Sequence, residues 1–154
     1  MNKTGELDRF DLAILRELAR ESRTAVQELG SRIGLSSTPC WNRIKALEAS
    51  GIIQSFGIRV DPAKLGFPET VIVMVTLENS TDTTGNAFEQ GLESIPEITE
   101  AYLVSGDYDY LLKVAARSSA DYEHLRDKLM KLPGVKRTKS SFMLRKIKVT
   151  ALPI

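Results

Sequence analysis

The sequence predicts an α+β protein with a small helical part followed by a four-stranded, ferredoxin-like part. Apolar residues follow a helical period of about 3.6 residues up to residue 50 and then alternate as in strands. Residues 70–144 give the order strand, helix, strand, strand, helix, strand, which is the split βαβ arrangement. Within them, Leu92–Ile98 and Leu129–Val135 repeat one pattern, a helix end, a proline stop and a strand start.

The first fifty residues predict three helices with clear end signals. Asp8 can cap the first helix, and Asp11 three residues later gives an acidic relative of the capping box. A second helix ends at Gly34, and a third follows with Ser36 as the expected N-cap and Pro39 in its first turn. Two short helices joined by a tight turn with glycine are typical of a helix-turn-helix.

The third helix, about residues 37–48, has one apolar and one polar face. At about 100° per residue, Cys40, Ile44 and Leu47 share the face that we expect to be buried. The opposite side carries Thr38, Trp41, Asn42 and Lys45. Residues 29–47 contain cations but no acid, which favours an anionic partner such as a DNA major groove. An ordinary bundle helix with a polar surface is the alternative.

Individual residues of this helix suggest different DNA contacts. Thr38, Asn42 and Lys45 are candidates for base edges or adjacent phosphates, and Ser37 with the helix N-terminus for a phosphate. Trp41 packs against a sugar or a thymine methyl group, or covers the edge of the domain.

Arg43 has two candidate roles. It lies about 60° from Cys40 around the helix, beside the buried stripe. We favour a phosphate contact over an internal ion pair.

A strand and a hinge follow the helices. Residues 52–60 alternate at Phe56, Ile58 and Val60, which predicts a strand, and residues 61–68 contain two prolines and a glycine. We therefore expect a helix-turn-helix domain at 1–52, a linker at 53–68 and a second domain at 69–154.

The second domain is expected to have strands at 70–77, 98–104, 108–116 and 135–144, helices at 84–94 and 120–132, and a further short strand at 146–149. Helices would cover one face of its sheet only. Neither side of the first strand is strongly polar, because three valines alternate with Ile72, Met74 and Thr76. Homodimerisation through the open face is the economical solution.

The segment Ser105-Gly106-Asp107-Tyr108-Asp109 is the second candidate site. Its simplest interpretation is a hairpin turn. However, carboxylates are disfavoured at a strand start, so Asp109 needs a reason. The N–H groups of a turn with glycine can bind a carboxylate, and Asp107 or Asp109 can accept from an ammonium group. A free amino acid carries both groups.

Together, the Leu7-Asp8-x-x-Asp11 helix, the Ser-x-Thr-Pro-Cys-x-x-Arg-Ile-Lys helix-turn-helix and the turn at 105–109 resemble the Lrp/AsnC (feast/famine) transcriptional regulators. The resemblance covers residues 7–152. It implies a winged helix-turn-helix DNA-binding domain and a ferredoxin-like (RAM/ACT-like) domain for amino-acid sensing. It also implies homodimers that assemble into tetramers or octamers. Trp41 stands where many members have a smaller aliphatic residue, so a relative's base preference does not transfer.

The same resemblance places the effector between dimers, at the turn, with the last strand completing the site. It adds lining candidates to the turn residues, and the full predicted set is Leu103, Ser105, Gly106, Asp107, Tyr108, Asp109, Ser140, Ser141, Phe142 and Met143.

Composition and single-residue counts exclude several classes of protein. The formal net charge is only +1, so any DNA-binding charge is local. The longest apolar run, Val71–Val75, is too short to span a membrane and the N-terminus has no apolar signal-peptide core, so we expect a soluble cytoplasmic protein. Cys40, the only cysteine, allows no internal disulfide and reads as a core residue rather than a redox sensor. His124 is the only histidine and belongs to no triad, so we expect no enzyme, metal or cofactor.

The basic residues between 136 and 148 are expected to be solvated edge charges, with support for DNA wrapping as the alternative. The sequence as a whole predicts a sequence-specific transcriptional regulator controlled by a small amino acid. Two rival functions remain. One is an effector-independent architectural DNA-binding protein, and the other is an amino-acid-sensing regulatory subunit that does not bind DNA.

Overall fold

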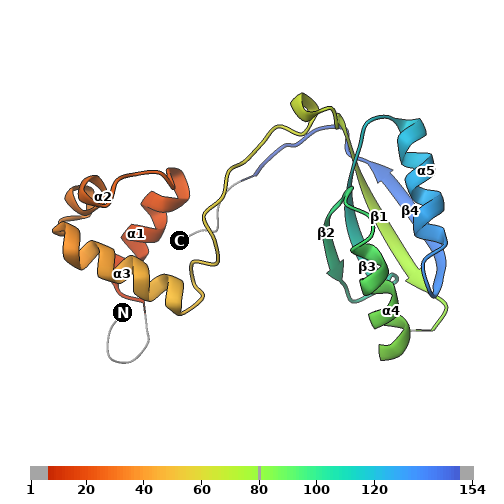
Figure 1. Ribbon diagram of the computed structural model, residues 1–154, viewed down its shortest axis with the longest axis horizontal. Helices are drawn as coiled ribbons and strands as arrows, with labels where there is room; N and C mark the ends of the chain where they lie inside the picture. The colour runs from red at the N-terminus through yellow and green to blue at the C-terminus, as the bar shows by residue number, and fades with distance from the viewer. Residues whose placement is uncertain (1–6, 80, 150–154) are drawn as a thin grey trace. The chain divides into compact units, whose positions relative to one another are not determined.

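The computed structural model describes every residue except 1–6, 80 and 150–154. The chain forms two compact units, whose helices and strands are labelled in Figure 1. One unit runs to Arg59 and also takes in residues 148–149, and the other spans Val60–Ile147. The boundary between residues 59 and 60 falls within the predicted linker. No helix in the described part of the chain is long and apolar enough to cross a membrane.

The first unit has the three predicted helices, α1 (Arg9–Arg20), α2 (Val26–Ile33) and α3 (Ser37–Ala49). Asp8 accepts hydrogen bonds from the N–H groups of Phe10 (2.8 Å) and Asp11 (3.0 Å), while the Asp11 carboxylate accepts from the Asp8 N–H (3.1 Å). This confirms the acidic capping box. The core is formed by the buried side chains of Ile14, Leu29, Cys40, Ile44 and Leu47.

The turn between α2 and α3 is as tight as the sequence predicts. Gly34 has a φ of 76°, a left-handed conformation that glycine adopts without a steric cost. Ser36 is the N-cap residue of α3, but its side chain makes no capping hydrogen bond, so the expected hydroxyl cap is wrong. Pro39 lies in the first turn as expected.

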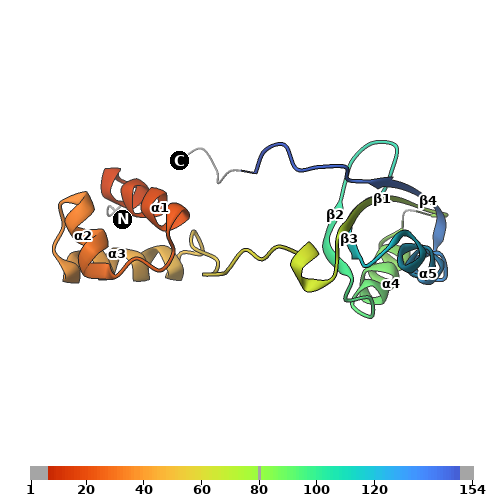
Figure 2. The same cartoon turned by 90° about the horizontal axis from the view of Figure 1, so that it is seen from above.

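The second unit has the predicted order β1 (Glu69–Leu77), α4 (Asp82–Leu92), β2 (Ile98–Leu103), β3 (Tyr110–Ala116), α5 (Ser119–Met130) and β4 (Val135–Phe142). The sheet is antiparallel with the strand order β2-β3-β1-β4. Figure 2 shows α4 and α5 on the same face of this sheet. The unit therefore has two layers, with an α+β ferredoxin-like topology.

The core of this unit lies between the sheet and the helices. Val71, Val73 and Val75 of β1 are fully buried, as are Leu112 of β3 and Phe88 of α4. The side chains on the other face of β1 alternate with the valines and are only half-buried. One face of the sheet thus has no helix covering it.

Three strand predictions need correction. Residues 52–60 and 146–149 are not strands, although Ile58 and Ile147 belong to the expected alternating pattern and are 75% and 86% exposed. Strand formation requires a hydrogen-bonded neighbour, and neither segment has one within the described chain. In addition, β3 begins at Tyr110 rather than at residue 108. The predicted linker contains one short 3-10 helix, η1 (Ala63–Leu65).

Candidate functional site

The α3 helix presents the polar face that its sequence predicts. Cys40, Ile44 and Leu47 are buried against α1 and α2. The side chains on the opposite face are exposed, namely those of Ser37, Thr38, Trp41, Asn42 and Lys45. The buried stripe thus fixes which side chains face solvent.

Lys45 and Trp41 are coupled on this exposed face. The Lys45 Nζ lies 4.7 Å from the centre of the Trp41 ring and 2.7 Å from Glu48 Oε2. The sequence window without acids therefore ends just before an acid that reaches Lys45. Exposed ion pairs of this kind are weak, so Lys45 can exchange Glu48 for a phosphate at little cost.

Arg43 is attached to the first helix. Its Nη1 donates to Asp8 Oδ2 (2.7 Å) and to Asp11 Oδ1 (2.8 Å), and its guanidinium lies 5.3 Å from the centre of the Phe10 ring. Asp11 is fully buried. The structure therefore favours the internal ion pair over the phosphate contact that we expected from the sequence.

These contacts keep both carboxylates ionised. The hydrogen bond from the Asp11 N–H, aided by Arg43, lowers the pKa of Asp8 to about 2. Burial opposes ionisation of Asp11, but hydrogen bonds from the Asp8 N–H and Arg43 outweigh it and lower the pKa of Asp11. The same two carboxylates raise the pKa of Arg43. The ion pair thus joins the N-terminus of α1 to the middle of α3.

The turn at 105–109 connects β2 to β3 and forms hydrogen bonds with the end of β1. Gly106 has a φ of 118°, so the turn requires glycine there. Asp109 Oδ2 accepts a hydrogen bond from the Leu77 N–H (2.8 Å), and the Asp109 N–H donates to the Val75 carbonyl (2.9 Å). The carboxylate at a strand start therefore has a structural reason: it holds the turn against the end of β1. Asp107 is exposed.

Leu103 and Asp109, both predicted to line the effector site, lie in one cavity of about 320 Å³. Its other walls come from β1, β3 and α4, through Leu77, Thr81, Asp82, Gly85, Asn86, Glu89 and Tyr110. The Tyr110 hydroxyl donates to Glu89 Oε1 (2.9 Å), and burial of Tyr110, followed by this contact, raises its pKa to about 12. Sequence analysis missed the α4 residues, because nothing in their pattern indicates that they reach the turn.

The last strand does not meet the turn within one chain. Ser140, Ser141 and Phe142 pair with Val73, Ile72 and Val71, whereas the turn is held at Val75 and Leu77. At about 3.3 Å per residue, Ser141 is roughly 10–17 Å away along the strand. The Ser140 hydroxyl instead forms a hydrogen bond with the Tyr122 hydroxyl. Met143 lines a separate cavity together with residues 61–63, 67–68, 70 and 144–146. A site with both parts needs the last strand of another subunit.

Arg137 is a residue at the turn that sequence analysis assigned to the solvated edge. Its Nε donates to Thr76 Oγ1 (3.2 Å), and its guanidinium lies 5.8 Å from the centre of the Tyr108 ring. It is the member of the basic run that the strand register brings to the end of β1. A cation therefore stands beside the turn.

Cys40 and His124, which the sequence singles out as its only cysteine and only histidine, show no sign of a redox or metal site in the part of the chain that the structure describes. Cys40 is fully buried, and this burial raises the pKa of its thiol, which makes it unreactive. Within the described ranges no group of three histidine, cysteine or carboxylate side chains could hold a metal ion. His124 is exposed on α5.

Comparisons with known proteins agree with this arrangement. Residues 7–54 match the family model of a winged helix-turn-helix DNA-binding domain, and residues 70–153 match that of the Lrp/AsnC ligand binding domain. The leucine-responsive regulatory protein of Haemophilus influenzae is 37% identical over 145 residues, which are 94% of this chain and 87% of that protein.

Two solved structures are similar along nearly the whole length. An AsnC family transcriptional regulator from Agrobacterium tumefaciens has a TM-score of 0.87 at 34% identity, with 94% of each chain covered. A transcriptional regulator from Neisseria meningitidis in complex with L-methionine has a TM-score of 0.88 at 29% identity, also with 94% of each chain covered. The chain therefore belongs to the Lrp/AsnC family of transcriptional regulators, which are DNA-binding proteins with a ligand-binding domain and are not enzymes.

Proposed function

We propose that this protein reads a specific DNA sequence as a dimer, with α3 in the major groove, and that a small amino acid controls its assembly. The main support for DNA binding is the buried stripe of α3. Because this stripe faces the core, Thr38, Asn42, Lys45 and Trp41 are exposed together on the opposite side. Two such helices related by a two-fold axis would enter successive major grooves about 34 Å apart.

Within α3 the residues take different roles. Asn42 can pair bidentately with an adenine, and Thr38 lies one turn before it on the same side. Ser37 and the first-turn N–H groups suit a phosphate, since the Ser36 hydroxyl does not occupy them. Lys45 contributes charge near the groove. Arg43 acts indirectly, by holding α3 against α1.

Binding to duplexes selected by the wild-type protein from a random-sequence pool tests this assignment. Asn42→Ala should weaken binding about 5- to 150-fold, the range of one bidentate base contact, and relax the preference at one base pair. Lys45→Ala should weaken binding to all sequences and reduce the salt dependence by about one ion. Gln27→Ala, on the exposed face of α2, is the matched control. Parental affinity in both α3 variants would overturn the assignment.

For the effector half, we propose that an amino acid binds at the turn. The N–H groups around Gly106 and the guanidinium of Arg137 would take its carboxylate, and Asp107 would accept from its ammonium group. Asp109 positions the turn through its hydrogen bond to Leu77. Support comes from the match to a ligand-binding family model and from the relative in complex with L-methionine.

The proposed site needs more than one subunit. The face of the sheet that lacks helices carries half-buried Ile72 and Met74, which favours pairing of two copies there. A second contact between dimers, giving a tetramer or octamer, would bring residues 140–143 of another subunit to the turn. The amino acid then shifts assembly only if it prefers one oligomer over another.

A thermal-shift panel of the common amino acids, including L-methionine and L-leucine, tests the effector proposal. An amino acid that raises the melting temperature should lose this effect in Asp107→Asn and keep it in Glu123→Gln, an exposed control on α5. Light scattering should show a species larger than a dimer whose mass changes with that amino acid. A protein that ignores the whole panel but binds DNA would be the effector-independent rival instead.

A further inference from the structure

A larger cavity lies at the other end of the second unit, away from the effector turn. It has a volume of about 550 Å³, within the usual range for small-molecule sites. Its lining includes Ala115 and Arg117, at the end of β3, whereas the turn precedes Tyr110 at the start of that strand. At about 3.3 Å per residue, the two ends of β3, Tyr110 and Ala116, are roughly 20 Å apart. The cavity is therefore separate from the proposed effector site.

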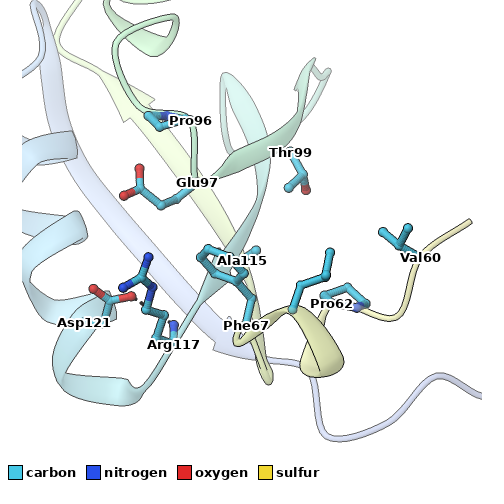
Figure 3. Close-up of a pocket in the computed structure, with 10 residues that line it drawn as sticks. Val60, Pro62, Phe67, Pro96, Glu97, Thr99, Ala115, Arg117 and Asp121 are labelled. Carbon is cyan, nitrogen blue, oxygen red and sulfur yellow. Dashed lines mark hydrogen bonds between the residues drawn. The ribbon is translucent and has the colours of Figure 1, made fainter.

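One side of the cavity is apolar. Figure 3 shows Val60, Pro62 and Phe67 along this side, and Leu65 of η1 also lines it. Leu65 is 62% exposed and Val60 55% exposed, although both are aliphatic. The wall could thus bury a further aliphatic group, and such burial is favourable.

The other side carries three charged groups. Figure 3 shows the Arg117 guanidinium beside Asp121 and directed toward Glu97. The Arg117 guanidinium also lies 5.3 Å from the centre of the Phe67 ring, and Asp121 Oδ2 accepts from the Arg117 N–H (2.9 Å). Two carboxylates and one guanidinium leave this end of the cavity with a net negative charge.

Glu97 is the group that points to a ligand. Its Oε2 is buried and has no hydrogen-bond partner among the residues that the structure describes. Only the backbone of this residue is held, since its carbonyl accepts from the Ala115 N–H (2.9 Å), so the side chain can rotate toward the cavity. A buried carboxylate oxygen without a donor is unfavourable, so a ligand that brings an N–H donor gains more than one that does not.

We propose that this cavity is a second small-molecule site, which takes an ammonium group on a short aliphatic body. The Glu97 side chain rotates its carboxylate into the cavity, where the ammonium group donates to Oε2, and the aliphatic body lies against Leu65, Phe67 and Pro62. A simple carboxylic acid of the same shape is rejected, because two carboxylates already stand at the charged end. This proposal does not depend on the effector turn, and it concerns a different set of residues.

Three probes with one branched carbon skeleton test it by calorimetry on the full chain at neutral pH. Isoamylamine carries the ammonium group only, 4-methylpentanoate the carboxylate only, and L-leucine both. Isoamylamine should bind the wild-type protein, and Glu97→Gln should weaken it at least tenfold. Glu123→Gln, which removes an exposed charge from α5, should leave its affinity unchanged.

Two further readouts separate binding from structure. Without ligand, Glu97→Gln should melt at the same temperature as the wild type or higher, because Oε2 gives up no hydrogen bond. Leu65→Ala, an exposed change outside the core, should weaken isoamylamine about threefold, in line with the loss of a partly buried apolar contact.

The proposal is overturned if isoamylamine gives no heat, if 4-methylpentanoate binds as well, or if Glu97→Gln leaves the amine affinity unchanged. L-Leucine distinguishes the two proposals. Heat that disappears in Asp107→Asn and survives in Glu97→Gln belongs to the turn. A failure at the turn leaves the isoamylamine result untouched.

Discussion

Replacing Arg43 by methionine should destabilise the first unit and weaken DNA binding without removing a DNA contact. The change keeps much of the apolar stem that lies against Phe10 but takes the guanidinium of Arg43 away from Asp11, which is fully buried. Breaking a buried ion pair by removing one partner costs about 3–5 kcal/mol. Because Asp11 keeps its hydrogen bond from the Asp8 N–H, we expect the lower end, about 3 kcal/mol.

The fluorescence of Trp41 allows the stability of the first unit to be measured separately from that of the second. This residue is the only tryptophan in the chain and lies on α3, so its fluorescence during urea unfolding reports the first unit. Arg32→Met is the matched control. Arg32 has three carboxylates within 3.7 Å, from Glu17, Glu21 and Glu28, but its own side chain is 39% exposed and none of the three is fully buried as Asp11 is, so these ion pairs contribute less.

Replacing Asp11 as well tests whether its buried charge causes the loss of stability in Arg43→Met. In the double variant Arg43→Met with Asp11→Leu, the buried charge that lost the Arg43 guanidinium is gone too, so part of the lost stability should return. Equal urea midpoints for Arg43→Met and Arg32→Met would refute the reasoning. So would a double variant that is less stable than Arg43→Met alone.

Three other outcomes follow from the contacts described above. The pKa of Asp8 is about 2, against an ordinary value of 3.8, so its charged carboxylate stabilises the fold fully above about pH 4. This contribution is lost as the pH falls through 2. Asp8→Asn should therefore flatten that part of an acid-unfolding curve. Asp109→Ala leaves the Leu77 N–H without its acceptor and should lower the free energy of unfolding by about 1–3 kcal/mol in a denaturation series, whereas Asp107→Ala should not change it. Cys40 should react with iodoacetamide only after unfolding, as mass spectrometry of native and denatured samples would show.

Local signals in the sequence predicted most of the fold. The Asp8–Asp11 capping box involves residues three positions apart, and the stripe of Cys40, Ile44 and Leu47 needs only helical rotation. Both depend on neighbours in the chain, so the sequence alone contains them. The strands expected at 52–60 and 146–149 failed for the opposite reason, since alternation shows that a segment suits a sheet but not that a neighbouring strand exists.

Among the candidate site residues, too, those that depend on local pattern were predicted and those that depend on distant contacts were not. The exposed face of α3 follows from periodicity, but the partners of Arg43 are 32 and 35 residues away, and no local pattern predicts them. Likewise Asp109 remains a predicted effector-site residue, but its hydrogen bond to the Leu77 N–H joins residues 32 positions apart, which no local pattern predicts. Arg137 became a candidate only when the register of β4 placed it beside Tyr108.

The order β2-β3-β1-β4 has a consequence for how the second unit can be handled as a module. The chain comes into this sheet at the start of β1 and leaves it at the end of β4, and these two points are adjacent, because the Met143 N–H donates to the Thr70 carbonyl (2.8 Å). A unit whose first and last strands are neighbours can be excised and grafted as a single insert. Transplanting residues 69–143 onto another helix-turn-helix should therefore transfer the fold of this unit, together with the ligand response that we propose for it.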